Sequence, residues 1–190
     1  IVRLQDGVGA AVKAMGSSHS MTSATVASSQ KVQEALDNIL RAVNLIVDQF
    51  QQRVWEDSKT GDTLPYNLFI PAGYDPAKSY PLVNFMHDAG NSSSNPLATL
   101  KQGLGAVSWA SDEDQAQRPA FVLAPQFAEI VTDDNSQTSS MLDTTLNLIT
   151  ALTQEFSIDP ARLSTTGQSG GGMLSIAMNI KYPDFFAASF

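Results

Sequence analysis

The chain has 190 residues, and its 11 Lys and Arg against 19 Asp and Glu give a formal net charge of −8 at pH 7. No apolar run approaches the roughly 20 residues of a membrane-spanning helix, and the few basic residues are scattered, so the sequence excludes a membrane span and argues against a nucleic-acid partner. Cysteine is absent, which excludes disulfides, thiolate zinc sites and cysteine nucleophiles.

The N-terminal quarter of the chain differs in pattern from the rest. Residues 16–30 are mostly Ser, Thr and other small residues without an apolar period, and we interpret them as a linker or mobile segment. In residues 31–47 apolar side chains recur every three or four positions, which predicts an amphipathic helix that packs on the core rather than in a coiled coil. The pattern then changes, so we divide the chain into an N-terminal segment, 1–48, and a main domain, 49–190.

The main domain begins with patterns typical of strands. Residues 51–56 and 64–70 predict two strands, and the turn-forming residues 59–62 between them predict an antiparallel hairpin. Residues 81–86 and 120–124 are nearly continuous apolar runs. Such runs are typical of central strands that are covered on both faces of a sheet.

Helical patterns alternate with these strands. The pattern is weak in residues 97–110 and strong in residues 140–156, where Ser140 and Asp143 predict a capping box. A short strand is expected at 162–166. The alternation indicates an α/β fold of three layers, with helices on both faces of a mostly parallel sheet.

The last predicted helix spans residues 170–182. Four apolar residues share a helical face there, and we expect this face to be buried. They are Met173, Ile176, Ala177 and Ile180.

A G-x-S-x-G motif, Gly167–Gly171, lies between a predicted strand and a predicted helix. A sharp strand-to-helix turn holds the middle residue in a strained conformation with its hydroxyl exposed, and the flanking glycines avoid Cβ clashes. The motif therefore predicts Ser169 as a nucleophile, with Gly167, Gln168 and Gly171 building the turn. The N–H of Gly170 would face a developing oxyanion. The alternative is a glycine-rich helix start with an ordinary N-capping serine.

A second polar motif, His87-Asp88-Ala89-Gly90, directly follows a predicted central strand. Open α/β sheets bind their ligands at this end of the strands. The turn can supply a second N–H for an oxyanion, from Asp88 or Ala89. We interpret His87 as a histidine that holds the loop through hydrogen bonds rather than as a general base. Residues 133–135 are interpreted as a solvated turn rather than a metal loop.

From about Trp55 to Phe190 the chain resembles the α/β-hydrolase esterases. This group includes phospholipase/carboxylesterase-like proteins, predicted peptidases, and feruloyl-esterase or polyhydroxybutyrate-depolymerase-type enzymes. Several separated segments carry the resemblance in the same order. They are residues 63–71, 80–83 with 87–90, 124–126, 158–162 with 166–172, and 182–188.

The resemblance implies a serine hydrolase that cleaves carboxylic esters through an acyl-enzyme on Ser169. Gly170 and the turn after His87 would form the oxyanion hole, and no metal or cofactor is implied. The substrate would be a small-molecule or polymer-derived ester, and a secreted or extracytoplasmic location is somewhat favoured. A peptidase or acyltransferase would use the same turn. A non-catalytic binding or scaffold protein on this fold also stays open, as does an accessory role for residues 1–48 in presenting the domain to a polymer or partner.

Two departures from the family pattern affect the site. Family members usually have Gly after the loop histidine, whereas Asp88 here brings a negative charge toward the developing anion. The family's triad runs Ser, acid, His along the chain, yet the only acid after Ser169 is Asp184 and no His follows. Asp184 lies away from the usual acid position, and His19 would break the chain order. We therefore expect a fragment, truncated before the triad acid and His.

Overall fold

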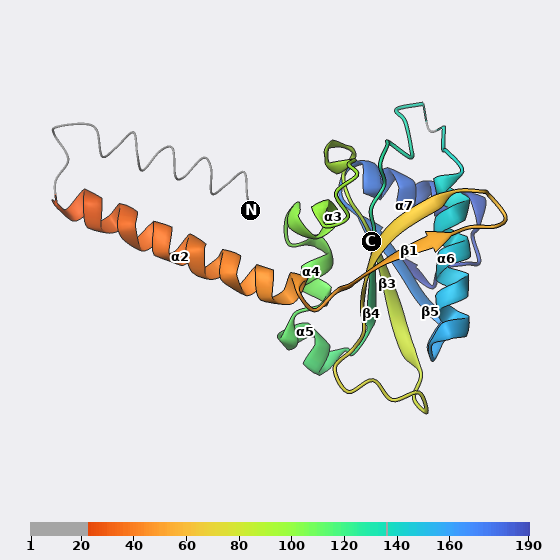
Figure 1. Cartoon of the computed structure of the whole chain (residues 1–190), viewed down its shortest axis with the longest axis horizontal. Coiled ribbons are helices and arrows are strands. Elements are labelled where there is room, and N and C mark those ends of the chain that lie inside the picture. The colour runs from red at the N-terminus through yellow and green to blue at the C-terminus, as the bar shows by residue number, and fades with distance from the viewer. Residues whose placement is uncertain (1–22, 136) are drawn as a thin grey trace.

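A computed structural model describes residues 23–135 and 137–190 (Figure 1). Its centre is a six-stranded sheet in the order β1-β2-β4-β3-β5-β6. The strands are β1 (Gln51–Glu56), β2 (Thr63–Phe69), β3 (Tyr80–Met86), β4 (Phe121–Pro125), β5 (Ile158–Gly167) and β6 (Ala188–Ser189). The helices are α2 (Ser23–Val47), the 3-10 turn η1 (Ala89–Asn91), α3 (Ala98–Lys101), α4 (Gly105–Trp109), α5 (Asp112–Gln117), α6 (Met141–Glu155) and α7 (Gly170–Lys181).

The sheet is mixed, as the sequence predicts. β1 pairs with β2 as an antiparallel hairpin, and β2 pairs antiparallel with β4. β4, β3, β5 and β6 are mutually parallel, so the N-terminal hairpin extends an otherwise parallel sheet. Helices α6 and α7 lie on one side of the sheet and α3, α4 and α5 on the other (Figure 1). The expected three-layer α/β class is therefore confirmed.

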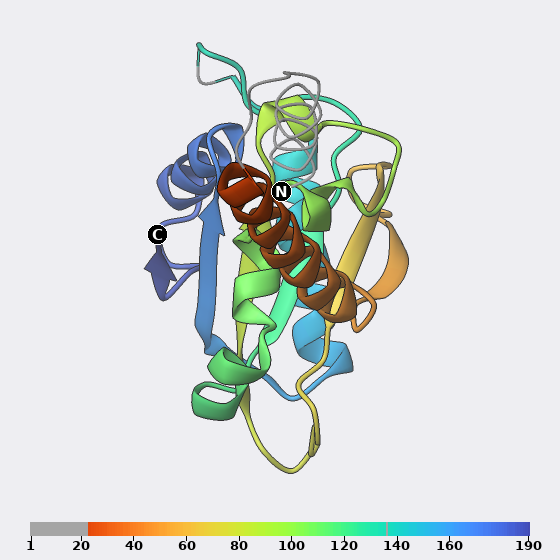
Figure 2. The same cartoon turned by 90° about the vertical axis from the view of Figure 1, so that its left-hand side faces the viewer.

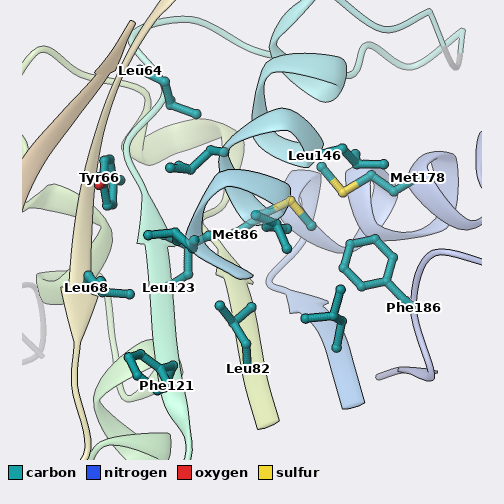
Figure 3. Close-up of a cluster of buried hydrophobic side chains, with 14 of the residues drawn as sticks. Leu64, Tyr66, Leu68, Leu82, Met86, Phe121, Leu123, Leu146, Met178 and Phe186 are labelled. Atoms are coloured by element: carbon teal, nitrogen blue, oxygen red, sulfur yellow. The ribbon is translucent and has the colours of Figure 1, made fainter. Parts of the chain in front are cut away.

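The continuous apolar runs of β3 and β4 form the core on both faces of the sheet. In β4, Phe121 and Leu123 face the cluster under α6 and α7, whereas Val122 and Ala124 face the cluster under α3 and α4. Figure 3 shows the first cluster, in which Met178 reaches the sheet from α7. Because both faces are covered, these strands cannot alternate apolar and polar residues.

Helix α6 spans the predicted range, but its predicted capping box is wrong. Ser140 adopts helical angles, φ −57° and ψ −21°, and its side chain makes no capping hydrogen bond, whereas a capping serine normally sits in the extended region. Asp143 instead accepts hydrogen bonds from Lys181 Nζ at 2.8 Å and from the Tyr182 hydroxyl at 2.7 Å. Its carboxylate therefore ties α6 to the C-terminal end of α7.

Helix α7 buries mostly a different face from the predicted one, although Ala177 packs against the core as predicted. Ile176 and Ile180 are 62% and 78% exposed, while Leu174 and Met178 are 2% and 0% exposed. Gly171 shares the buried face, at three and seven residues before Leu174 and Met178. The contact of Gly171 with β3, described below, sets the rotation of the helix and overrides the apolar periodicity.

Helix α2 begins earlier than predicted and packs less. Residues 23–30 are helical, which corrects the predicted linker there, while residues 16–22 lie outside the described residues. Only the end of the helix joins the core, where Val43 and Val47 pack with residues of α4. Val32 and Ile39 are 50% and 48% exposed, and the helix projects away from the sheet (Figures 1 and 2). The prediction that its apolar stripe packs on the core is wrong for these earlier turns.

The remaining predictions differ only in extent. Strand β5 begins four residues before the predicted 162–166, and the weak helical pattern of 97–110 is divided between α3 and α4.

Asp133 and Asn135 lie in an exposed turn in which Asp133 Oδ1 accepts a hydrogen bond from Asn135 N at 2.9 Å. Within the described ranges, no helix is both long and apolar enough to cross a membrane.

Candidate active site

A sharp turn at Ser169 connects β5 to α7. β5 ends at Gly167 and α7 begins at Gly170, so two residues complete the reversal. Ser169 has φ 51° and ψ −113°, and among the described residues it is the only non-glycine with a positive φ. Such a conformation costs about 1–3 kcal/mol and persists only where the surroundings enforce it. The strain leaves the Ser169 side chain exposed at the carboxyl end of the parallel strands.

Close backbone contacts enforce this turn. A Cβ on Gly167 would lie 2.3 Å from the carbonyl carbon of Gly171, and a Cβ on Gly171 would lie 2.0 Å from the carbonyl oxygen of Met86. Any side chain larger than hydrogen would therefore collide with main chain. The N–H of Gln168 also donates to the Met86 carbonyl at 3.1 Å. The Ser169 turn thus rests directly on the end of β3.

The loop after β3, residues 87–91, is held by a buried histidine. His87 is 4% exposed, its Nε2 accepts the backbone N–H of Phe127 at 3.0 Å, and its Nδ1 lies 2.7 Å from the carbonyl oxygen of Asp88. Since Nε2 accepts, the proton is assigned to Nδ1, which donates to Asp88. Burial lowers the pKa of His87 below its ordinary value. Both ring nitrogens of the neutral His87 are therefore occupied by hydrogen bonds that hold the loop.

Gln126, to which the sequence analysis assigned no role, holds the other side of this loop. It is 1% exposed, and its Nε2 donates to the carbonyl of Asn91 at 2.9 Å. Its Oε1 accepts the backbone N–H of Thr99 at 2.7 Å. In the sequence, this role is signalled only by the position of the glutamine directly after a central strand. No neighbouring residue identifies the partners of its amide.

Two backbone N–H groups lie side by side next to Ser169. A Cβ built on Gly170 would lie 3.1 Å from the nitrogen of Ala89. Each nitrogen begins a helical turn, and in the described part of the chain neither N–H has an acceptor. The N–H of Asp88, by contrast, donates to Gln102 Oε1 at 3.0 Å, and its carboxylate accepts from Asn91 Nδ2 at 2.8 Å. The pair at Ala89 and Gly170 can bind an anionic oxygen.

A small cavity adjoins these two N–H groups. Its volume is about 20 Å³, which is room for one or two water molecules. Both the loop after β3 and the Ser169 turn contribute to its wall, and its apolar lining includes Phe127, Ile130, Val131 and Leu174. The cavity can therefore take a small apolar group beside a bound anionic oxygen.

Comparison with known proteins shows what this chain resembles. No family model matches the chain, and no curated protein matches it. Among solved structures, a thermostable esterase superposes with a TM-score of 0.73 at 33% sequence identity, over 76% of this chain. The chain is thus similar to the α/β-hydrolase esterases and shares their fold.

Two less similar solved structures share the fold. A feruloyl esterase module from Clostridium thermocellum, solved with sinapinate, is 18% identical with a TM-score of 0.56 over 74% of this chain. A fluorophosphonate-binding serine hydrolase of Staphylococcus aureus is 15% identical with a TM-score of 0.55 over 74% of this chain. This chain spans 41% of the length of the thermostable esterase and 52% and 55% of the other two.

In the described part of the chain, no His, Asp or Glu side chain makes a hydrogen bond to the Ser169 hydroxyl. His87 is the only histidine in this part and is engaged as described. Asp184 follows the C-terminal end of α7, about 18 Å along a 12-residue helix from the Ser169 turn. His19 lies outside the described residues. Within residues 23–135 and 137–190, no cluster of His, Asp and Glu is suited to a metal ion.

Proposed function

We propose that this chain supplies the nucleophile and the oxyanion hole of a serine esterase that cleaves carboxylic esters through an acyl-enzyme on Ser169. One observation carries the proposal. Ser169 is held in a strained, exposed conformation beside two N–H groups that have no acceptor in the described chain. An N-capping serine would need neither the strain nor the second N–H.

The reaction follows from this geometry in two halves. Ser169 Oγ attacks the acyl carbon while a base takes its proton, and the carbonyl oxygen becomes an anion. The N–H groups of Ala89 and Gly170 donate to this oxygen. The bond to the alcohol oxygen then breaks, the alcohol takes up the proton and the acyl group stays on Ser169. Attack by water, through a second oxyanion, releases the acid and restores the serine.

We assign the second oxyanion donor to Ala89 rather than Asp88. The N–H of Asp88 already donates to Gln102, so it would have to break a hydrogen bond to serve. The Asp88 carboxylate accepts from Asn91 within its own loop. This contact gives the negative charge a partner away from the developing anion, and it accommodates the departure from the family's usual glycine.

We place the acyl substituent in the small cavity beside the oxyanion hole. Its apolar wall suits a hydrocarbon chain, and its volume of about 20 Å³ suits an acetyl-sized group better than a long chain. The alcohol portion would leave toward solvent on the exposed side of Ser169. The proposed substrates are therefore esters of short carboxylic acids.

The general base and its acid are proposed to lie on sequence that follows Ser169 in a longer protein. The hydrolase fold uses the chain order Ser, acid, His, and the chain spans 41% of the thermostable esterase. Without a base, the same chain would be a binding or scaffold protein. A peptidase or an acyltransferase would share the nucleophile and differ only in the group that leaves or attacks.

Intact mass spectrometry of the natural protein, before and after a fluorophosphonate probe, tests the proposal. One adduct is expected, together with turnover of 4-nitrophenyl acetate, and both should vanish in Ser169→Ala. Ser94→Ala, at an exposed serine in the loop before α3, is the matched control and should keep both. A natural protein with neither adduct nor turnover would overturn the esterase proposal in favour of the binding protein.

A further inference from the structure

We infer that Gln102 is a positioning residue that sets the distance between the two N–H groups of the oxyanion hole. The inference rests on the proposed function. Gln102 directly follows α3 and is partly buried. It contacts neither Ser169 nor Ala89 through a hydrogen bond, so it would act through other residues rather than on the substrate.

The Gln102 side chain joins the two loops that carry the N–H groups. Its Oε1 accepts the N–H of Asp88 at 3.0 Å, and its Nε2 donates to Gln168 Oε1 at 3.1 Å. Asp88 directly precedes Ala89, and Gln168 lies two residues before Gly170. A single amide thus connects the residue directly before one donor to the residue two positions before the other.

The bonds to Asp88 also determine where the Ala89 N–H points. The carbonyl of Asp88 and the N–H of Ala89 belong to one planar trans peptide, so they point in opposite directions. His87 Nδ1 and Asn91 N both donate to this carbonyl, at 2.7 and 3.1 Å. With Gln102 on the N–H of Asp88, both peptide groups of Asp88 are held. The Ala89 N–H is therefore held pointing away from His87 Nδ1 and Asn91 N.

The other hydrogen bond between the two loops lies at their base. There the N–H of Gln168 donates to the carbonyl of Met86, before the β3 loop begins. That bond anchors the Ser169 turn but does not orient Asp88 or Ala89. In the described chain, the Gln102 amide is therefore what connects the two loops by hydrogen bonds close to the N–H groups of Ala89 and Gly170.

A misplaced donor weakens binding of the transition state more than binding of the ester. The anionic oxygen exists only after attack, so loss of Gln102 should lower kcat and leave KM nearly unchanged. A shift of about 1 Å in a catalytic group costs up to about a hundredfold in rate. We expect Gln102→Met, which keeps the volume and removes both hydrogen bonds, to lower kcat about tenfold or more.

Gln115→Met is the matched control. Gln115 is also a partly buried glutamine that joins two segments, donating to the carbonyls of Trp109 and Ala120 at 2.7 and 3.1 Å. It lies at α5, outside both loops. A structural loss alone should therefore lower the melting temperature of Gln115→Met and leave its kcat within about twofold of the natural protein.

The decisive comparison measures kcat, KM and melting temperature for the natural full-length protein, Gln102→Met, Gln168→Leu and the double variant. Both single variants remove the same hydrogen bond, so the double variant should lose little more than the worse single variant. An active natural protein whose Gln102→Met variant keeps kcat within twofold overturns this inference alone. A natural protein with no turnover and no fluorophosphonate adduct overturns the proposed function instead.

Discussion

The two loops that carry the N–H groups of Ala89 and Gly170 are held in opposite ways. The loop after β3 is held by buried polar side chains, His87 and Gln126, that bond its main chain. The Ser169 turn is held by main chain packed on main chain, at Gly167 and Gly171. One half of the site thus depends on hydrogen bonds that polar side chains must supply, and the other depends on the absence of side chains.

The glycine-packed half should be the more sensitive to a single added methyl group. Gly171→Ala places a Cβ 2.0 Å from the Met86 carbonyl oxygen, so β3 and α7 must move apart. We expect a loss of at least about 3 kcal/mol in the free energy of unfolding, measured in urea, together with loss of turnover. Gly172→Ala is the matched control. Its Cβ would lie 3.4 Å from the Gly167 carbonyl oxygen, so its effect should stay within about 1 kcal/mol.

The half of the site held by polar side chains should lose stability when one buried amide is replaced by a hydrocarbon of similar shape. Gln126→Leu leaves the N–H of Thr99 and the carbonyl of Asn91 without their partner. Each buried group left unpaired costs about 1–3 kcal/mol, so we expect a loss of about 2–3 kcal/mol by urea unfolding. Equal stability of Gln126→Leu and the natural protein would contradict the role assigned to these bonds.

The polar half should also respond to acid, because its histidine is buried and neutral. Burial lowers the pKa of His87 below its ordinary 6.5 in the folded state. As the pH falls through 6.5, the unfolded chain binds a proton that the folded chain does not, so stability declines below that pH. Melting temperatures measured at intervals from pH 7.5 to 4.5 should therefore fall.

His87→Gln isolates this contribution. The variant should be less stable at pH 7.5, by about 1–3 kcal/mol, because the Phe127 N–H loses its acceptor. Its melting temperature should nevertheless depend less on pH between 6.5 and 4.5 than that of the natural protein. An unchanged slope in the variant would show that other groups cause the acid response.

The smallest effect concerns the cavity to which both loops contribute. Leu174→Ala enlarges it from the α7 side, and we expect the ratio of kcat/KM for 4-nitrophenyl butyrate to that for the acetate to rise about tenfold. Ile176→Ala, at a 62% exposed position of the same helix, is the control and should leave the ratio unchanged. A ratio that stays constant in both variants would contradict the proposal that the acyl group binds in this cavity.

The sequence predicted those structural features that depend on residues close together in the chain. The Ser169 turn was foreseeable because the motif that encodes it spans five consecutive residues, and β3 and β4 were foreseeable from unbroken apolar runs. The roles of Gln102 and Gln126 were not, because their partners lie as far as 66 residues away and glutamine has no local pattern that signals such contacts. The buried face of α7 was mispredicted for the same reason, since a contact with another strand sets its rotation.

Helix α7 is attached to the rest of the domain at both of its ends. Gly171 is pressed against Met86 at one end, and Lys181 and Tyr182 hold Asp143 at the other. Sliding or pivoting of this helix would break contacts at both ends. We therefore expect adjustment to the size of an acyl group to come from the opposite wall of the cavity, where Glu129 and Ile130 are exposed to solvent. The contacts that fix the Ser169 turn and the residues that could adjust to the acyl group thus lie in different segments of the chain.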